Sequence, residues 1–479
     1  MKNINSITRW LAAGLAFVAC FSAETAWAQN DQDRIQPWEE NSYYWQYKGE
    51  PVLLLGGSKD DNLFQIPGLR EHLEEISEAG GNYIRNTMSD RPMDGERPGS
   101  GFVEYPFKQL DNGKYDLDQW NEEYWKRFEQ MLRWTSERDI IVQIEIWDRF
   151  DYSRDNWPPH PYNPRNNINY SYEESGFQPE YPEHPGANEQ PFFFTTPEQR
   201  HNEIVLQYQQ KFVSKLLDYA LEYPNVLYCM DNETSGEEAW AVYWAEFVRQ
   251  RAEQENKSVY LTEMWDDWDL TAEEHRRTLD HPERFDFVDV SQNNHQRNET
   301  HWQNFLWVRD YISDHPRPIN SVKIYGADDG RHGGDNIDAV EKMWRLIFAG
   351  AASARFHRPS SGIGLSGLAK TQLRSARMLL EEFNIFEARP DTGHSLLSGR
   401  EEDEAYLSYI EDEHYAVFFT GGGEVELQLP ENGRRWQVRW LDISKRQWVR
   451  HQAVSQQKVS LRAPGDGPWV AFISKGMEE

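Results

Sequence analysis

Ten carboxylates follow short apolar runs of the chain, at positions where they could carry acid–base chemistry. They are Asp60, Asp61, Glu145, Asp148, Asp231, Glu233, Glu263, Asp266, Asp328 and Asp329. If the runs are parallel strands, their carboxyl ends meet at one face, and clustered carboxylates shift one another's pKa values. One group can then hold a proton while another stays ionised, as general acid and base catalysis requires.

The sharpest motif is Met230-Asp-Asn-Glu-Thr234, directly after the fourth run. An Asn before a Glu can bind a substrate hydroxyl while the Glu carboxyl reaches the bond to be broken. We therefore predict Glu233 as the catalytic acid. Two candidates remain for the second carboxylate, Glu263 and Asp328. Glu263 is slightly favoured, because its run is expected to neighbour that of Glu233.

Other polar and aromatic side chains at the ends of the runs are candidate substrate-binding groups. Amides, carboxylates and Arg can bind hydroxyls, and Trp rings can stack on C–H-rich faces. Structural roles stay open for several residues: Arg85 could close the fold through an ion pair, Glu145 could be a hydrogen-bonded core group, and Glu233 could favour a helix N-terminus. The Trp rings could serve only packing, and His295 could be structural. The full set is Arg85, Asn86, Glu145, Trp147, Asp148, Asn232, Trp265, Asn293 and His295, with Trp268 as a further stacking candidate.

A scaffold of alternating strands and helices would position these residues. Between residues 50 and 360, eight apolar runs alternate with stretches whose apolar residues recur every three or four positions. Eight such units favour a (β/α)8 barrel over an open doubly wound sheet. The runs are 51–55, 82–85, 140–146, 226–230, 258–262, 287–290, 319–324 and 351–356.

Two further regions flank these units. Residues 148–197 are too long and too aromatic for an ordinary connector, so we expect an ordered cover over the barrel mouth. From about residue 390 the apolar pattern changes to period two, with Gly- and Pro-rich turns, which predicts a small antiparallel β-sandwich. The expected domains are 29–389 for the barrel and 390–479 for the sandwich.

Composition restricts the partners. The chain has 80 Asp and Glu against 50 Lys and Arg, a net charge of −30, which disfavours nucleic acid. Residues 1–28 resemble a signal peptide cleaved after Ala28, which predicts a periplasmic or secreted protein; a lipid anchor at Cys20 is less favoured. The apolar part of this segment is too short to span a bilayer, and nothing indicates an oligomeric state.

No cofactor or metal is predicted. The chain contains neither a Gly-x-Gly-x-x-Gly motif after the first run nor a Walker-type loop, and His-Glu-x-x-His is absent. The acidic stretch Asp60-Asp61-Asn62 lacks the spaced oxygen ligands of a calcium loop.

A family resemblance rests on the Asn232-Glu233 pair and on Arg85 in Tyr83-Ile-Arg-Asn86. These residues resemble the clan of (β/α)8 glycoside hydrolases in which that Glu is the general acid/base. The C-terminal part, with Trp440-Leu-Asp442 and 464–469, is similar to the sandwich of apiosidase-like, collagen-binding-domain-associated glycosidases. The resemblance implies an exported enzyme that cleaves glycosidic bonds of plant or algal polysaccharides with two carboxylates and no cofactor. It also implies that His295 binds the sugar ring.

One departure from the clan pattern keeps two alternatives open. The clan places a nucleophilic Glu at the end of the seventh strand, whereas residues 318–330 contain no Glu. The chain could therefore be a carbohydrate-binding barrel without hydrolytic activity. It could also be a polysaccharide lyase that uses Arg85, His295 and Lys323.

Overall fold

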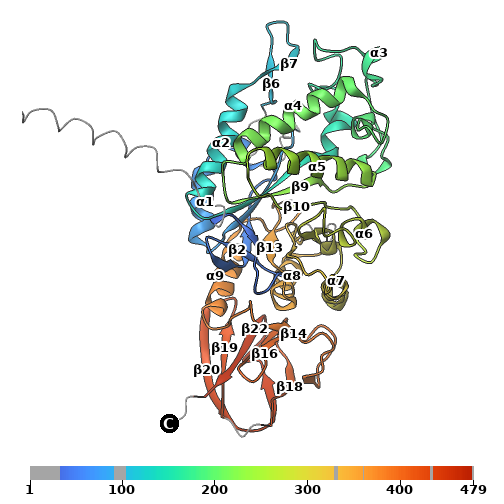
Figure 1. Cartoon of the computed structure of the whole chain (residues 1–479). Coiled ribbons are helices and arrows are strands. Elements are labelled where there is room, and N and C mark those ends of the chain that lie inside the picture. The colour runs from blue at the N-terminus through green and yellow to red at the C-terminus, as the bar shows by residue number, and fades with distance from the viewer. Residues whose placement is uncertain (1–32, 91–103, 328–332, 360, 432–434, 477–479) are drawn as a thin grey trace, which may run out of the picture.

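The structure is a computed structural model that describes residues 33–90, 104–327, 333–359, 361–431 and 435–476 (Figure 1). Eight parallel strands form the barrel, so the predicted fold class is confirmed. Six of them make one sheet in the order β10-β9-β8-β5-β4-β13, and β11 pairs with β12. The strands are β4 (Leu54–Gly57), β5 (Tyr83–Thr87), β8 (Ile141–Asp148), β9 (Val226–Asn232), β10 (Leu261–Thr262), β11 (Val288–Asp289), β12 (Ile319–Asn320) and β13 (Ser353–Phe356).

Backbone hydrogen bonds close the ring between the two sheets. The carbonyl of Leu261 on β10 accepts from the amide of Asp286 just before β11 at 2.8 Å. On the other side, the carbonyl of Ile319 on β12 accepts from the amide of Ala352 just before β13 at 2.9 Å. All eight carboxyl ends therefore face one mouth, as expected for a parallel barrel.

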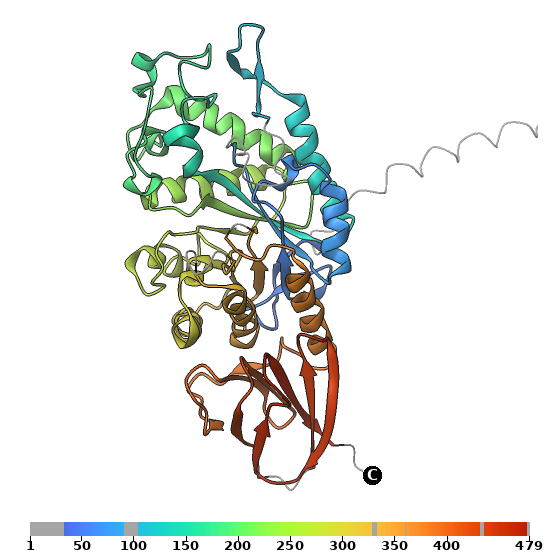
Figure 2. The same ribbon diagram turned by 180° about the vertical axis from the view of Figure 1, so that it is seen from behind.

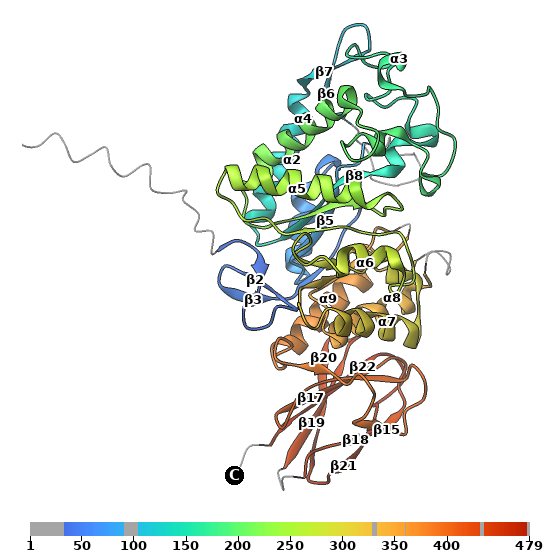
Figure 3. The same cartoon turned by 45° about the vertical axis from the view of Figure 1, so that its right-hand side comes forward.

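Helices surround the strands (Figures 2 and 3). Helix α8 shows why such segments are helical: the Asp335 side chain accepts from the amides of Ile337 and Asp338 in a capping box, and Gly350 ends the helix with φ 84°. Its apolar residues recur at helical spacing and are buried. The helices are α1 (Leu69–Glu78), α2 (Glu122–Ser136), α4 (Glu203–Ala220), α5 (Glu238–Gln254), α6 (Glu273–Leu279), α7 (Asn298–Tyr311), α8 (Asn336–Ala349) and α9 (Gly367–Leu380).

A three-stranded antiparallel sheet at the N-terminus covers the bottom of the barrel. It consists of β1 (Gln36–Pro37), β2 (Trp45–Tyr47) and β3 (Glu50–Val52). The Trp45 ring is fully buried and packs edge-to-face on Phe287, and its indole N–H donates to the side-chain oxygen of Asn320 on β12 at 2.9 Å. The bottom of the barrel is thus a packed core rather than an opening.

The segment after β8 is ordered and has a core of its own. Tyr152 stacks on Phe192 with ring centroids 3.9 Å apart, and Trp157 and Phe177 pack edge-to-face at 5.4 Å. It lies at the end of the molecule opposite the C-terminal sheets (Figures 1 and 2). Its elements are η3 (Arg149–Tyr152), η4 (Arg154–Asn156), α3 (Tyr172–Ser175), η5 (Pro185–Ala187) and η6 (Pro191–Phe194), beside the hairpin of β6 (Phe107–Gln109) and β7 (Tyr115–Trp120).

Two antiparallel sheets form the C-terminal sandwich, in the orders β14-β16-β17-β22-β19-β20 and β15-β18-β21. Buried side chains from both sheets, such as Val417 and Leu427, form its core. The opposite face of the larger sheet packs on the barrel helices, where Phe418 stacks on Trp344 of α8 at 5.8 Å. The strands are β14 (Arg389–Pro390), β15 (Leu397–Ser398), β16 (Ala405–Ile410), β17 (His414–Phe419), β18 (Glu424–Gln428), β19 (Trp436–Asp442), β20 (Gln447–Val454), β21 (Lys458–Arg462) and β22 (Trp469–Lys475).

Within the described residues, none of the helices is long and apolar enough to cross a bilayer. The predicted signal peptide and Cys20 lie outside the described residues.

Candidate active site

Arg85, in the middle of β5, joins side chains of three other strands or their ends inside the barrel. Its Nε donates to Glu145 Oε2 of β8 at 2.7 Å, one terminal nitrogen lies 3.6 Å from Asp61 Oδ1 after β4, and the other donates to Asn232 Oδ1 of β9 at 3.2 Å. Burial raises the pKa of Glu145 to about 7, although Arg85 opposes the shift. Arg85 and Glu145 therefore form the buried ion pair that a structural role requires, and Arg85 also orients Asn232.

The side chain of Asn232 is held by charged groups on several sides. Its amide nitrogen donates to Asp148 Oδ2 at 3.0 Å, and its oxygen accepts from Lys323 Nζ at 2.5 Å as well as from Arg85. Lys323 follows β12 and is 1% exposed. Asn232 thus links the fourth and seventh strands, and its oxygen is already occupied by two cations.

Glu233 directly follows the last residue of β9. Its backbone adopts a left-handed conformation with φ 53°, which turns the side chain out of the strand direction. Its Oε1 lies 2.7 Å from Lys323 Nζ and accepts from the Tyr325 hydroxyl at 3.0 Å. Burial raises its pKa, but Lys323, Arg85 and the Tyr325 hydrogen bond outweigh burial and lower the pKa to about 2. Glu233 is therefore ionised at neutral pH in the free protein, which differs from the protonated state expected of a general acid.

Asp266, on the loop after β10, has the opposite shift. Its amide donates to the carbonyl of Thr234 at 2.9 Å, which ties this loop to the end of β9 beside Glu233. Partial burial of the carboxyl, and then the negative charge of Glu233, raise its pKa to about 7. Since the residue as a whole is exposed, solvent screening limits this shift.

Glu263 is buried beside the backbone of Asp231. It is 1% exposed, and its Oε1 accepts from the backbone amides of Asp231 at 2.9 Å and Met264 at 2.8 Å. Burial and the neighbouring carboxyl of Asp231 raise its pKa well above the usual range, and burial raises that of Asp231 to about 7. The sequence favoured Glu263 as second carboxylate, but this geometry makes it a support for the two strand ends that carry Glu233 and Asp266.

An aromatic wall borders the mouth. Trp268, 54% exposed, stacks on His295 with centroids 4.0 Å apart and an interplanar angle of 11°. His295 contacts the Tyr325 ring at 5.2 Å, and Tyr325 contacts His357 at 4.9 Å. The wall thus offers an exposed indole face suitable for stacking on a sugar ring.

Four predicted substrate-binding residues have structural contacts instead. Trp147 and Trp265 are both 1% exposed; Trp147 packs on Trp244, and the Trp265 indole N–H donates to the Thr278 hydroxyl at 2.8 Å. The Asn86 oxygen accepts from the amides of Leu63 and Phe64, and the Asn293 amide donates to the carbonyl of His301. Asp328, the other candidate second carboxylate, lies outside the described residues.

Sequence reasoning missed Tyr325, His357 and Arg358. A signal exists for each: Tyr325 follows Lys323 at the alternating spacing of the seventh run, and His357 and Arg358 come directly after the eighth. Arg358 donates to Asp61 Oδ2 at 2.8 Å. Burial alone would raise the pKa of Asp61. The neighbouring charges of Arg85, His357 and Arg358 nevertheless hold this pKa well below the usual range.

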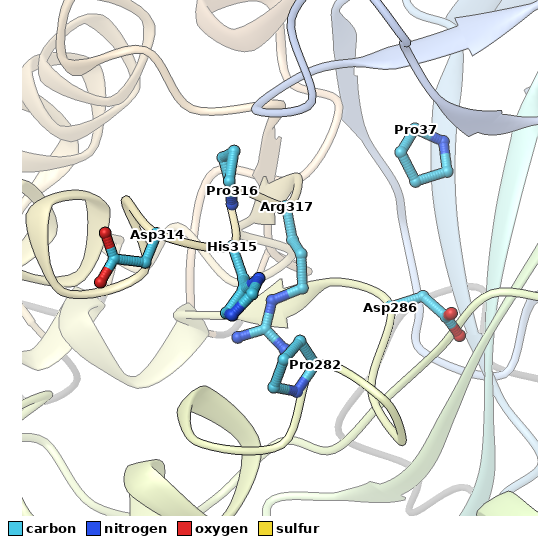
Figure 4. A pocket seen from close by; sticks show the side chains of 7 residues that line it. All are labelled: Pro37, Pro282, Asp286, Asp314, His315, Pro316 and Arg317. Atoms are coloured by element: carbon cyan, nitrogen blue, oxygen red, sulfur yellow. The ribbon is translucent and has the colours of Figure 1, made fainter.

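A separate cavity of about 390 Å³ opens near the amino ends of β11 and β12, away from the mouth (Figure 4). The guanidinium of Arg317, one of its lining residues, donates to the carbonyls of Phe285 and Leu279, both at 2.8 Å. These bonds tie loops together, so Arg317 has a structural role. The cavity is lined by Pro37, Pro282, Asp286, Asp314, His315, Pro316 and Arg317.

Comparisons with known proteins give the fold. No family model matches the sequence, and no curated protein matches it. Among solved structures, the chain is similar to a family 5 glycoside hydrolase from Bacteroides vulgatus, with a TM-score of 0.60 and 13% identity over 93% of both chains. It is also similar to a protein described as a glycoside hydrolase, with a TM-score of 0.60 and 13% identity over 94% of this chain and 98% of the other. The likeness covers nearly the whole chain, and at this identity it shows a shared fold.

Proposed function

We propose that the protein is a glycoside hydrolase whose reaction takes place between Glu233 and Asp266. The observation that carries the proposal is the placement of two carboxyls at adjoining strand ends: Glu233 lies 2.7 Å from Lys323, and the loop of Asp266 is bound to the Thr234 carbonyl at 2.9 Å. Their pKa values are displaced in opposite directions. Such a pair divides the work of glycosidic cleavage, because one carboxylate stays ionised while the other can protonate the leaving oxygen. The fold shared with two glycoside hydrolases supports the proposal.

The roles differ from those that the sequence alone suggests. Lys323 keeps Glu233 ionised, so Glu233 accepts a proton, and Asp266 donates one to the leaving group. Trp268 stacks on a sugar ring at the rim. The proposed substrates are plant or algal polysaccharides, reached after export through the segment 1–28; the apiosidase-like resemblance remains a prediction.

The test is a screen of the purified protein against such polysaccharides, with reducing ends and ultraviolet absorbance recorded together. Hydrolysis releases reducing ends without ultraviolet absorbance. We expect Glu233→Gln to lower turnover by ~10²–10⁴-fold, because the amide keeps the shape but cannot accept a proton. The matched control is Glu237→Gln, an exposed carboxylate that accepts from Gln199 outside the mouth. Wild-type turnover in Glu233→Gln would remove this residue from the mechanism.

A second candidate is a polysaccharide lyase. The Tyr325 ring lies between those of His295 and His357, and Lys323 and Arg85 could neutralise a uronate carboxylate. A lyase forms an unsaturated product that absorbs in the ultraviolet, so the same screen separates the two reactions. Binding of oligosaccharide without any product would instead indicate the non-catalytic carbohydrate-binding barrel.

A further inference from the structure

The seventh strand of the barrel brings a phenol to Glu233. Tyr325 is 7% exposed and donates its hydroxyl proton to Glu233 Oε1 over 3.0 Å. We propose that Tyr325 is the nucleophile that attacks the anomeric carbon and that Glu233 is the base that takes its proton. The inference rests on the proposed glycoside hydrolase function and names the attacking atom for it.

The contacts of Glu233 suit a base better than a nucleophile. Its Oε1 faces both Lys323 Nζ at 2.7 Å and the Tyr325 hydroxyl at 3.0 Å, so this oxygen is already engaged by two donors. An oxygen held in this way is a poor attacking atom for carbon. It is, however, already the acceptor of the phenol hydrogen bond; because the pKa of Glu233 is low, the proton moves only as the bond to carbon forms.

The surroundings of Tyr325 favour attack by a neutral group. The mouth already contains the carboxylates of Asp61, Asp148 and Glu233, so a phenol approaches a sugar without adding another charge. Burial and the charge of Glu233 raise the pKa of Tyr325, and Arg85 partly offsets the shift. Proton transfer to Glu233 during attack avoids a free phenolate. Tyrosine nucleophiles of this kind occur in some glycosidases.

The two steps balance. In the first, the bond from Tyr325 Oη to the anomeric carbon forms as the glycosidic bond breaks; Glu233 receives the phenol proton, and Asp266 protonates the leaving oxygen. In the second, water attacks the anomeric carbon and gives a proton to Asp266. The bond to Tyr325 breaks, and its oxygen recovers the proton from Glu233. Two displacements at one carbon give net retention of anomeric configuration.

The test uses the full chain and the polysaccharide that the screen identifies. Tyr325→Phe removes only the hydroxyl and keeps the ring contacts with His295 and His357. We expect a loss of ~10³-fold or more in kcat with an unchanged thermal midpoint. The control is Tyr311→Phe, because the Tyr311 hydroxyl also donates to a carboxylate, Asp280 at 2.6 Å, but on the surface.

Two further measurements separate the nucleophile from a merely structural hydroxyl. Proton NMR of the first-formed product should show the retained anomer. Mass spectrometry after a slow fluorosugar, activated at the anomeric carbon, should place the sugar on Tyr325. An inverted first product, or near-normal turnover in Tyr325→Phe, would overturn the inference while leaving glycoside hydrolysis intact. A wild-type protein that releases no reducing ends would overturn both.

Discussion

Two neighbouring groups of carboxyls in this barrel have pKa values shifted in opposite directions: Glu233, and the buried pair of Asp231 and Glu263, called here the rear layer. Glu233 faces the mouth, whereas Asp231, two residues earlier on the same strand end, faces the buried Glu263. The pKa of Glu233 is lowered to about 2, whereas those of Asp231 and Glu263 are raised. Burial raises the pKa of all three carboxyls, so burial alone cannot explain why that of Glu233 is lowered.

The pKa values differ because Lys323 and Arg149 contact different groups. Lys323 lies 2.7 Å from Glu233 and compensates its charge directly. In the rear layer, Arg149 donates to the Thr234 hydroxyl and to the Asn188 oxygen, both at 2.7 Å, and so compensates the carboxyls only at a distance. The close contact of Lys323, with the charge of Arg85 and the Tyr325 hydrogen bond, therefore lowers the pKa of Glu233, whereas the pKa values of Asp231 and Glu263 stay raised.

The largest effect that would break this comparison is expected at Asp266. Asp266→Asn should lower kcat/KM by ~10²–10⁴-fold, because the amide cannot protonate the leaving oxygen. The pKa of Asp266 is raised, and screening keeps it between its usual value and about 7, so wild-type activity should fall as the pH rises through this range. The pH–rate profiles of both proteins measure this, and the variant should lack the alkaline fall.

Asp314→Asn, a change near the opposite cavity, is the control for Asp266→Asn. If the activity of Asp266→Asn still fell at alkaline pH as in the wild type, the fall would belong to another titrating group.

Substitution of Glu263 in the rear layer should change the free energy of unfolding rather than the turnover rate. Glu263→Ala removes an acceptor for two buried amides and should lower the free energy of unfolding by about 2–3 kcal/mol, whereas Glu263→Gln keeps an acceptor and should lose much less. The folded-state pKa of Glu263 is raised, so its stabilising contribution is full below the unfolded pKa of about 4.3 and falls as the pH rises. Gln does not titrate, so the variant should gain on the wild type as pH increases.

Urea unfolding between about pH 4 and pH 8 would check both statements. Equal losses in the Gln and Ala variants would show that the two amides do not depend on this acceptor.

The smallest effect is expected at the rim. Trp268→Ala removes an exposed ring that stacks on His295, and should raise KM by ~2–10-fold with kcat and thermal midpoint nearly unchanged. The variant Ile337→Ala, at an exposed position of α8, controls for the loss of apolar surface. A fall in kcat without a change in KM would place Trp268 in the chemistry instead.

The barrel could be predicted from the sequence because its signals are local. Apolar runs and helical spacing repeat eight times, and the change to period two marks the sandwich. The strand ends also identified Arg85, Asn232, Glu233 and His295 as mouth residues, since carboxyl ends must converge in a parallel barrel.

The side that each strand-end residue faces could not be predicted. Glu145 lies inside the barrel against Arg85, yet Trp147, two positions later, packs on Trp244 of the helix layer. Strict alternation would place both on one face, so the strand departs from its regular pleat at its end. The ion pair of Lys323 with Glu233 depends on residues 90 positions apart, and nothing in either local segment indicates it.

The indole of Trp45 has a consequence for how the chain folds. Its hydrogen bond to Asn320 joins residues 275 positions apart and ties the N-terminal sheet to the seventh strand. A contact of such separation requires closure of a very long loop, so it forms late. During synthesis, the apolar side chains at the bottom of the first strands stay exposed to solvent until β12 has left the ribosome. We expect this interval to be the time when the nascent chain most needs a chaperone.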